Sequence, residues 1–143
     1  FQCHNMEHQL GAFTDCNHGQ GLAVLHPVYY RHIYRDGLPK FVRFAQNVWG
    51  IARRGQTDEQ LALAGVEALN QRRNAASPFL LEVSRVEALA EFIREVGLPT
   101  TLQELGVQRG QLREIAGSCG ISGGSYRPLT HGEILDIFEE CYE

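Results

Sequence analysis

The sequence has no long apolar run, no basic excess and no closely spaced pair of cysteines. Its 143 residues hold 13 Lys and Arg against 17 Asp and Glu, which gives a formal net charge of −4. This balance argues against nucleic acid or an anionic membrane as a ligand. Apolar runs reach only four or five residues, whereas a membrane-spanning helix needs about 20. We therefore expect neither a nucleic-acid partner nor a membrane partner.

Cysteine and targeting signals are also sparse. The four cysteines lie far apart, at positions 3, 16, 119 and 141, and form no C-x-x-C pair. This spacing argues against a disulfide framework and a thiolate zinc site, and it favours a reducing, cytoplasmic setting. The first four residues, Phe-Gln-Cys-His, lack the basic and apolar segments of a signal peptide. Because the chain starts with Phe1, we expect it to begin inside a longer protein.

Strand signals are nearly absent, so the pattern predicts an all-α fold without an internal domain boundary. No segment alternates apolar and polar residues over the length of a strand, and apolar residues recur instead at helical spacing. Pro27 falls inside one expected helix, where it should cause a kink. We expect helices at residues 2–13, 18–34, 39–50, 57–69, 84–97, 101–105, 108–116 and 130–138, with loops at about 70–78 and 117–128.

Capping patterns support several of these boundaries. Residues 57–60 and 84–87 each read as a capping box, in which a Ser or Thr is followed three positions later by Gln or Glu. Asn17 and Thr130 are suited to cap the helices that follow them.

Three histidines near the start of the chain are candidate metal ligands. His4 and His8 are four residues apart and therefore share one face of a helix. His18 follows ten residues later, just past an expected turn that can bring it back to that face. Imidazole is a common ligand for iron and zinc, and Glu7 and Asp15 add carboxylates nearby. We expect the other histidines to be ordinary surface or core residues: His26, His32 and His131.

One alternative interpretation concerns the same segment. Residues 4–8 fit H-x-x-E-H, a zinc metallopeptidase pattern in which two His bind zinc and the Glu, here Glu7, acts as a general base. Such a site needs a third protein ligand, and it does not account for the Gly and His residues that follow. Under this hypothesis Glu7→Gln would abolish peptide hydrolysis.

Residues 1–13 and 17–27 together resemble the iron-containing alcohol dehydrogenase family, and most closely its butanol-dehydrogenase-like branch. The family pattern is H-x-x-x-H-x-L-G-A, followed ten residues after its second His by His-Gly and an apolar helix that reaches a Pro. This chain has both spacings. Residues 43–50, 97–100 and 128–130 also look like this branch, so the similarity spans most of the chain.

The resemblance implies a fold and a site. The fold would be the multi-helix C-terminal domain of dehydroquinate synthase-like and iron-containing alcohol dehydrogenases. In the family, an Asp and a His from an upstream helix and two further His bind a divalent metal, and those two correspond to His4 and His18. His8 corresponds to a histidine beside the metal and the nicotinamide, which positions the substrate or relays a proton. The expected cofactors are Fe²⁺ or Zn²⁺, together with NAD(P)H bound by an N-terminal domain.

The implied reaction interconverts small primary alcohols and aldehydes by hydride transfer, with Glu7 dispensable for the chemistry. The chain has no Gly-rich dinucleotide loop in a βαβ context and no upstream Asp-x-x-x-His pair. We therefore expect residues 1–143 to be a single helical metal-binding domain, without its dinucleotide-binding domain and upstream ligand helix. Alone it should be inactive, and its uncovered apolar surface should favour a homo-oligomer. The alternative is a non-enzymatic helical fragment or interaction module.

Overall fold

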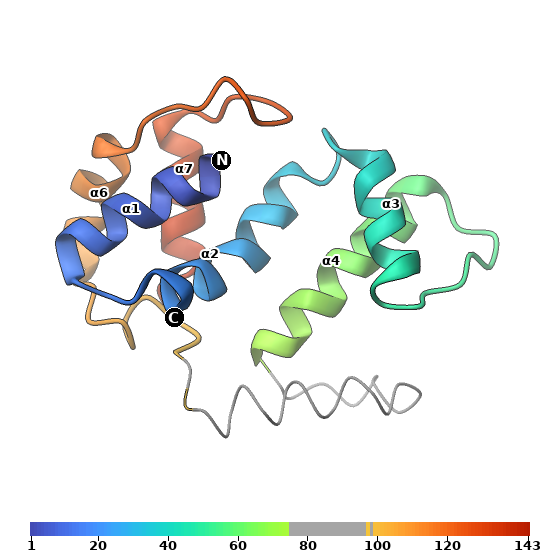
Figure 1. Cartoon of the computed structure of the whole chain (residues 1–143), viewed down its shortest axis with the longest axis horizontal. Coiled ribbons are helices and arrows are strands. Elements are labelled where there is room, and N and C mark those ends of the chain that lie inside the picture. Colours follow the sequence, from blue (N-terminus) through green and yellow to red (C-terminus); the bar gives the residue numbers. More distant parts are fainter. Residues whose placement is uncertain (75–96, 98) are drawn as a thin grey trace.

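The computed structural model describes residues 1–74, 97 and 99–143. All the regular elements of this described part are helices, which confirms the all-α prediction (Figure 1). The expected helix and capping box at residues 84–97 fall almost entirely outside it. The elements are α1 (Gln2–Thr14), α2 (His18–Ile33), α3 (Leu38–Asn47), α4 (Asp58–Asn74), a short 3₁₀ helix η2 (Arg109–Gln111), α6 (Leu112–Ser118) and α7 (His131–Glu140).

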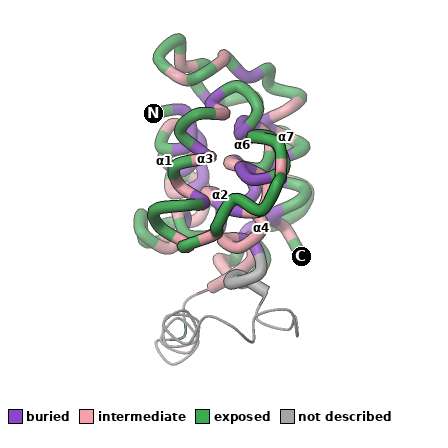
Figure 2. The backbone as a smooth tube through the Cα atoms, turned by 90° about the vertical axis from the view of Figure 1, so that its right-hand side faces the viewer, coloured by how far each residue is buried: buried purple, intermediate pink, exposed green. Residues whose placement is uncertain are grey.

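Helix α2 is the central element, because it packs against α1, α4 and α7. The α3–α4 pair packs tightly at one end of the molecule, while α1, α6 and α7 gather at the other end (Figure 1). Buried positions recur along the helices, and exposed positions dominate the connections between them (Figure 2). No helix among the described residues is long and apolar enough to cross a membrane.

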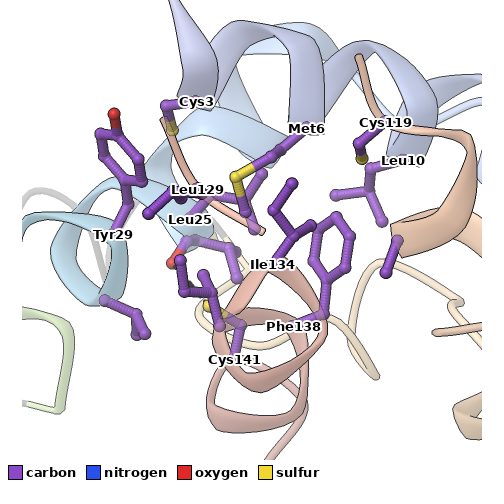
Figure 3. Close-up of a cluster of buried hydrophobic side chains, with 14 of the residues drawn as sticks. Cys3, Met6, Leu10, Leu25, Tyr29, Cys119, Leu129, Ile134, Phe138 and Cys141 are labelled. Atoms are coloured by element: carbon purple, nitrogen blue, oxygen red, sulfur yellow. Dashed lines mark hydrogen bonds between the residues drawn. The ribbon is translucent and has the colours of Figure 1, made fainter. Parts of the chain in front are cut away.

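The main core lies where α1, α2 and α7 meet (Figure 3). Met6 and Leu10 on α1 are fully buried, as are Ile134 and Phe138 on α7. Each pair is four residues apart, so both side chains point from the same helical face into the core. This packing fixes the inner face of α1 and therefore also determines which of its residues face outward.

The two helix ends that flank the short α1–α2 connection are both capped. Asp15 adopts a left-handed conformation with φ of 57°, and its N–H donates to the carbonyl of Gly11 at 2.8 Å. The Asn17 side chain accepts from the N–H of Gly19 at 2.9 Å, as expected for a helix N-cap. The start of α2, at His18, is thereby held against α1.

The capping boxes in the described part are confirmed. The Thr57 and Gln60 side chains each accept from the other residue's backbone N–H, at 3.2 and 3.0 Å. Thr130 and Glu133 pair in the same way at the start of α7. Most other predicted boundaries agree with the structure to within about three residues.

Two boundary predictions were wrong. Helix α4 continues through residues 70–74, where a loop was expected, and Asn70 is buried. Residues 101–106 form turns rather than a helix. The backbone N–H groups of Leu102 and Gln103 donate to the carbonyls of Cys141 and Tyr142, at 2.8 and 3.3 Å. These bonds hold the segment against the C-terminal residues.

We expect Asn70→Ala to lower the free energy of unfolding by about 1–2 kcal/mol. The Asn70 amide donates to the carbonyl of Pro27 in α2 at 3.1 Å and to that of Val66 at 3.0 Å, so it ties α4 to α2. Urea unfolding followed by circular dichroism measures the change. Glu67→Ala, at a half-buried position of the same helix, is the matched control. Ordinary surface substitutions change stability by up to about 0.5 kcal/mol. A smaller loss than this for Asn70→Ala would contradict the stabilising role of these two hydrogen bonds.

Candidate metal centre

Three imidazoles gather between the start of α1 and the start of α2. His4 and His8 lie one turn apart on α1, and His18 is the first residue of α2. The ring centroid of His18 is 5.5 Å from that of His4 and 5.3 Å from that of His8. The structure thus brings together the three histidines that the sequence singled out, and all three are exposed.

The spacing of His18 from either histidine of α1 is compatible with a shared metal ion. With metal–nitrogen distances of about 2.1 Å and a tetrahedral angle, two ligating imidazoles have their centroids about 5 Å apart. The observed separations from His18, 5.5 Å for His4 and 5.3 Å for His8, are both close to this value. Imidazole nitrogens also suit a borderline divalent metal such as Fe²⁺ or Zn²⁺. The residues present therefore fit the metal that the resemblance implies.

Glu7 contacts the histidine cluster directly, which the sequence pattern did not predict. Its side chain is buried, at 2% exposure, and its Oε2 accepts from Nδ1 of His18. A ligand atom of Glu7, one of His8 and one of His18 all lie within 4.8 Å of one another, and His4 is not part of this group. Gly21 makes room for this side chain, because a Cβ there would lie 2.8 Å from Cγ of Glu7.

The position of Glu7 gives no support to the metallopeptidase alternative. A general base must reach the proton that it abstracts within the open site. Glu7 is instead enclosed between α1 and α2, and its Oε2 is already engaged with His18. Asp15, the other carboxylate noted in the sequence, lines a separate cavity of about 660 Å³ beside the α1–α2 connection.

An open cavity of about 460 Å³ adjoins His4. His26 also lines it, with its ring centroid 6.2 Å from that of His4, which is nearer to the candidate centre than the sequence analysis expected. Its spacing of two helical turns from His18 was the signal that could have revealed this. Burial lowers the pKa of His26 below its usual value. The remaining lining residues are mainly aromatic or small: Phe1, Cys3, Tyr29, Tyr30, Ile33, Gly124, Ser125 and Tyr126.

The two other histidines are ordinary hydrogen-bonded residues, as expected. Nε2 of His32 pairs with the Glu140 carboxylate at 2.8 Å on the surface. Nε2 of His131 donates to the carbonyl of Cys119 at 3.0 Å. Neither belongs to the candidate metal group.

We expect a thiol reagent to label Cys16 first in the folded chain. All four cysteines are free thiols, but only Cys16 is partly exposed. Burial raises the pKa of Cys119 to about 11 and that of Cys3 to about 12, so their reactive thiolate forms are scarce at neutral pH. Their labelling should be at least about 100-fold slower than that of Cys16. Mass spectrometry of timed labelling measures the order, and fast labelling of Cys119 in the folded chain would contradict it.

The buried thiols of Cys3 and Cys119 should also make the free energy of unfolding depend on pH. An unfolded thiol loses its proton near pH 8.5, whereas folded Cys119 and Cys3 retain theirs to about pH 11 and 12. The folded chain therefore binds more protons in this range, so the free energy of unfolding falls as pH rises above about 8.5. Urea unfolding of the parent and of Cys119→Ala compares the slopes, and the variant should lose less stability over this range.

Comparisons with known proteins identify relatives of this chain. The model of the Fe-containing alcohol dehydrogenase family, C-terminal part, matches residues 1–80. NADH-dependent butanol dehydrogenase A of Clostridium acetobutylicum is 31% identical over 147 residues, which cover 99% of this chain and 32% of that protein. NADPH-dependent butanol dehydrogenase of Clostridium saccharobutylicum is 25% identical over 149 residues, covering 98% and 32%.

A solved structure shows the same arrangement of helices. NADH-dependent butanol dehydrogenase A from Thermotoga maritima superposes with a TM-score of 0.72 at 25% identity, over 99% of this chain and 33% of that one. The chain thus spans about one third of the length of the relatives that it matches. The matched family segment contains α1 and α2 with all three clustered histidines. The chain therefore belongs to the Fe-containing alcohol dehydrogenase family and corresponds to its C-terminal helical domain.

Proposed function

We propose that this chain is the metal-binding helical part of a nicotinamide-dependent dehydrogenase that interconverts primary alcohols and aldehydes. The observation that carries the proposal is the cluster of His4, His8 and His18 between α1 and α2, in a member of the Fe-containing alcohol dehydrogenase family. The two butanol dehydrogenases compared above support the choice of substrate class.

His4 and His18 are the residues that we propose to hold Fe²⁺ or Zn²⁺, with further ligands supplied by residues outside the chain. When bound, the metal supplies a Lewis acid that polarises the substrate oxygen, and the nicotinamide supplies or accepts the hydride. His8 is exposed beside His18. We assign it the transfer of a proton between the substrate oxygen and solvent, because imidazole can both donate and accept near neutral pH.

The cavity beside His4 is the proposed place for the carbon chain of the substrate. Its volume of about 460 Å³ lies in the usual range of small-molecule pockets. The rings of Tyr30 and Tyr126 offer apolar surface to a short alkyl chain, and Ser125 offers a hydroxyl. This composition suits a small alcohol or aldehyde better than a charged substrate.

We propose that residues outside this 143-residue chain bind the dinucleotide. The relatives are about three times as long as the chain. With two proposed metal ligands in place of four, the chain alone should bind metal weakly and show no turnover. The names of the two butanol dehydrogenases specify NADH for one and NADPH for the other, so activity is measured with both.

Metal binding and turnover are the two measurements that test this function. Equilibrium dialysis of the metal-free chain against Fe²⁺ under anaerobic conditions, and against Zn²⁺, should show about one ion per chain at saturation. The natural product of the gene should oxidise reduced nicotinamide when butanal is added. Absence of metal binding at every concentration would overturn the proposal. A gene product that binds metal and dinucleotide without turnover would favour the non-enzymatic alternative.

A further inference from the structure

We propose that Glu7 is a positioning residue that prepares His18 to bind the metal. This inference rests on the proposed function, because it takes His18 as a metal ligand. It departs from the expectation that Glu7 is dispensable, and it assigns the residue a role through His18 rather than a contact with substrate.

The hydrogen bond between Glu7 and His18 selects one tautomer of the imidazole. Oε2 of Glu7 contacts Nδ1 of His18. Because an ionised carboxylate can only accept a hydrogen bond, the ring proton is held on Nδ1. The lone pair of Nε2 is then left free for a metal ion. Carboxylates that accept from the second nitrogen of a ligating histidine fix its orientation and raise its basicity.

Glu7 is buried and His18 is half exposed, as expected if Glu7 orients His18 toward an incoming metal ion. Glu7 has a side-chain exposure of 3%, whereas that of His18 is 50%. The hydrogen bond therefore lies on the protein side of the imidazole, where low dielectric strengthens it. The rest of the ring remains accessible to an ion arriving from solvent.

The backbone around Glu7 is shaped to keep the carboxylate in place. Gly21 lies one turn after His18, and a Cβ there would come within 2.8 Å of Cγ and 3.0 Å of Oε1 of Glu7. Gly11 is also close, with a Cβ position 3.6 Å from Oε1. The close approach of α2 leaves Glu7 little freedom to rotate away from His18, so the imidazole is oriented before the metal binds.

A direct metal–carboxylate bond is the competing arrangement, because ligand atoms of Glu7, His8 and His18 all lie within 4.8 Å. The contact between Oε2 and Nδ1 argues against it. Two atoms in hydrogen-bond contact leave no room for a metal ion between them. Glu7 is also buried, whereas the two histidines are exposed to solvent.

The first test needs no substitution. Long-range ¹H–¹⁵N correlation NMR of the metal-free chain distinguishes the two imidazole tautomers. We expect His18 at neutral pH to carry its proton on Nδ1. The opposite tautomer, protonated at Nε2, would overturn the proposal.

The second test compares two Glu→Gln variants of matched chemistry. Glu7→Gln keeps the size of the side chain and removes its charge. Glu140→Gln does the same in a second Glu–His pair, with His32, remote from the site. In Co²⁺ titrations followed by absorption, Glu7→Gln should bind about 10–100-fold more weakly than the parent, with unchanged band positions. Glu140→Gln should bind as the parent does.

The outcomes separate this inference from the function on which it rests. Equal Co²⁺ affinity of parent and Glu7→Gln overturns the role of Glu7 alone. A shift of the Co²⁺ bands in Glu7→Gln overturns it in favour of direct ligation by the carboxylate. Failure of the unmodified chain to bind Co²⁺ overturns the proposed function, and this role with it. Circular dichroism establishes that each variant is folded before its affinity is compared.

Discussion

Replacing His18 with alanine is expected to weaken Co²⁺ or Zn²⁺ binding by more than 100-fold. Loss of a residue that only supports a ligand costs about 10–100-fold in metal affinity, so loss of the ligand itself should cost more. The substitution also leaves the buried Glu7 carboxylate without its partner. Equilibrium dialysis and absorption titration measure the affinity, and His4→Ala should show a loss of similar size.

His32→Ala is the matched control for both variants. It also removes one imidazole that is paired with a carboxylate, but His32 lies on the far part of α2, beside Glu140. Metal affinity should be unchanged in this variant. Undiminished binding in His4→Ala or His18→Ala would show that the ion binds elsewhere and would remove the proposed ligand assignment.

Gly65→Ala is expected to lower the free energy of unfolding by about 3 kcal/mol. Gly65 lies where α3 and α4 pack closely, and a Cβ there would be 2.7 Å from Cβ and 2.8 Å from Cα of Ala45. Because one of these atoms belongs to the backbone, no side-chain rotation can relieve the overlap. The two helices must move apart, which loosens the packing of α4 against α2. Urea unfolding and the thermal midpoint measure the effect.

Gly117→Ala is the control for this prediction. Gly117 lies in α6, and a Cβ there would meet no atom within 4 Å. Alanine favours a helix over glycine by up to about 1 kcal/mol, so this variant should be as stable as the parent or slightly more stable. Equal behaviour of the two variants would contradict the close packing of α3 on α4.

Local signals predicted the helices whose ends are capped by nearby residues. Asn17 caps α2, and Thr57 with Gln60 opens α4, through bonds that span two or three residues. Such contacts are encoded within a single turn, so the sequence pattern is enough to find them. The i, i+4 spacing of His4 and His8 is local in the same sense, and it placed both on one helical face.

Predictions failed where a distant residue decides the local structure. The bond from Asn70 to the Pro27 carbonyl spans 43 residues and accompanies the extension of α4 beyond the expected end. Leu102 donates to the carbonyl of Cys141, which lies 39 positions further along the chain, and this bond holds residues 101–106 against the C-terminal residues. Polar residues such as Asn70 are usually exposed or in loops, so nothing in its neighbourhood indicated burial.

The sequence by itself determined the all-α class, the capped helix starts, the family and the three clustered histidines, because each depends on spacing along one short segment. The tertiary structure decided that Glu7 is buried against His18 and that His26 faces the cavity beside His4. These features require α1 and α2 to approach closely, which Gly21 permits. Burial and pairing across two helices arise only when the helices pack, so the sequence pattern located the proposed ligands and the packing supplied the residue that we propose to orient one of them.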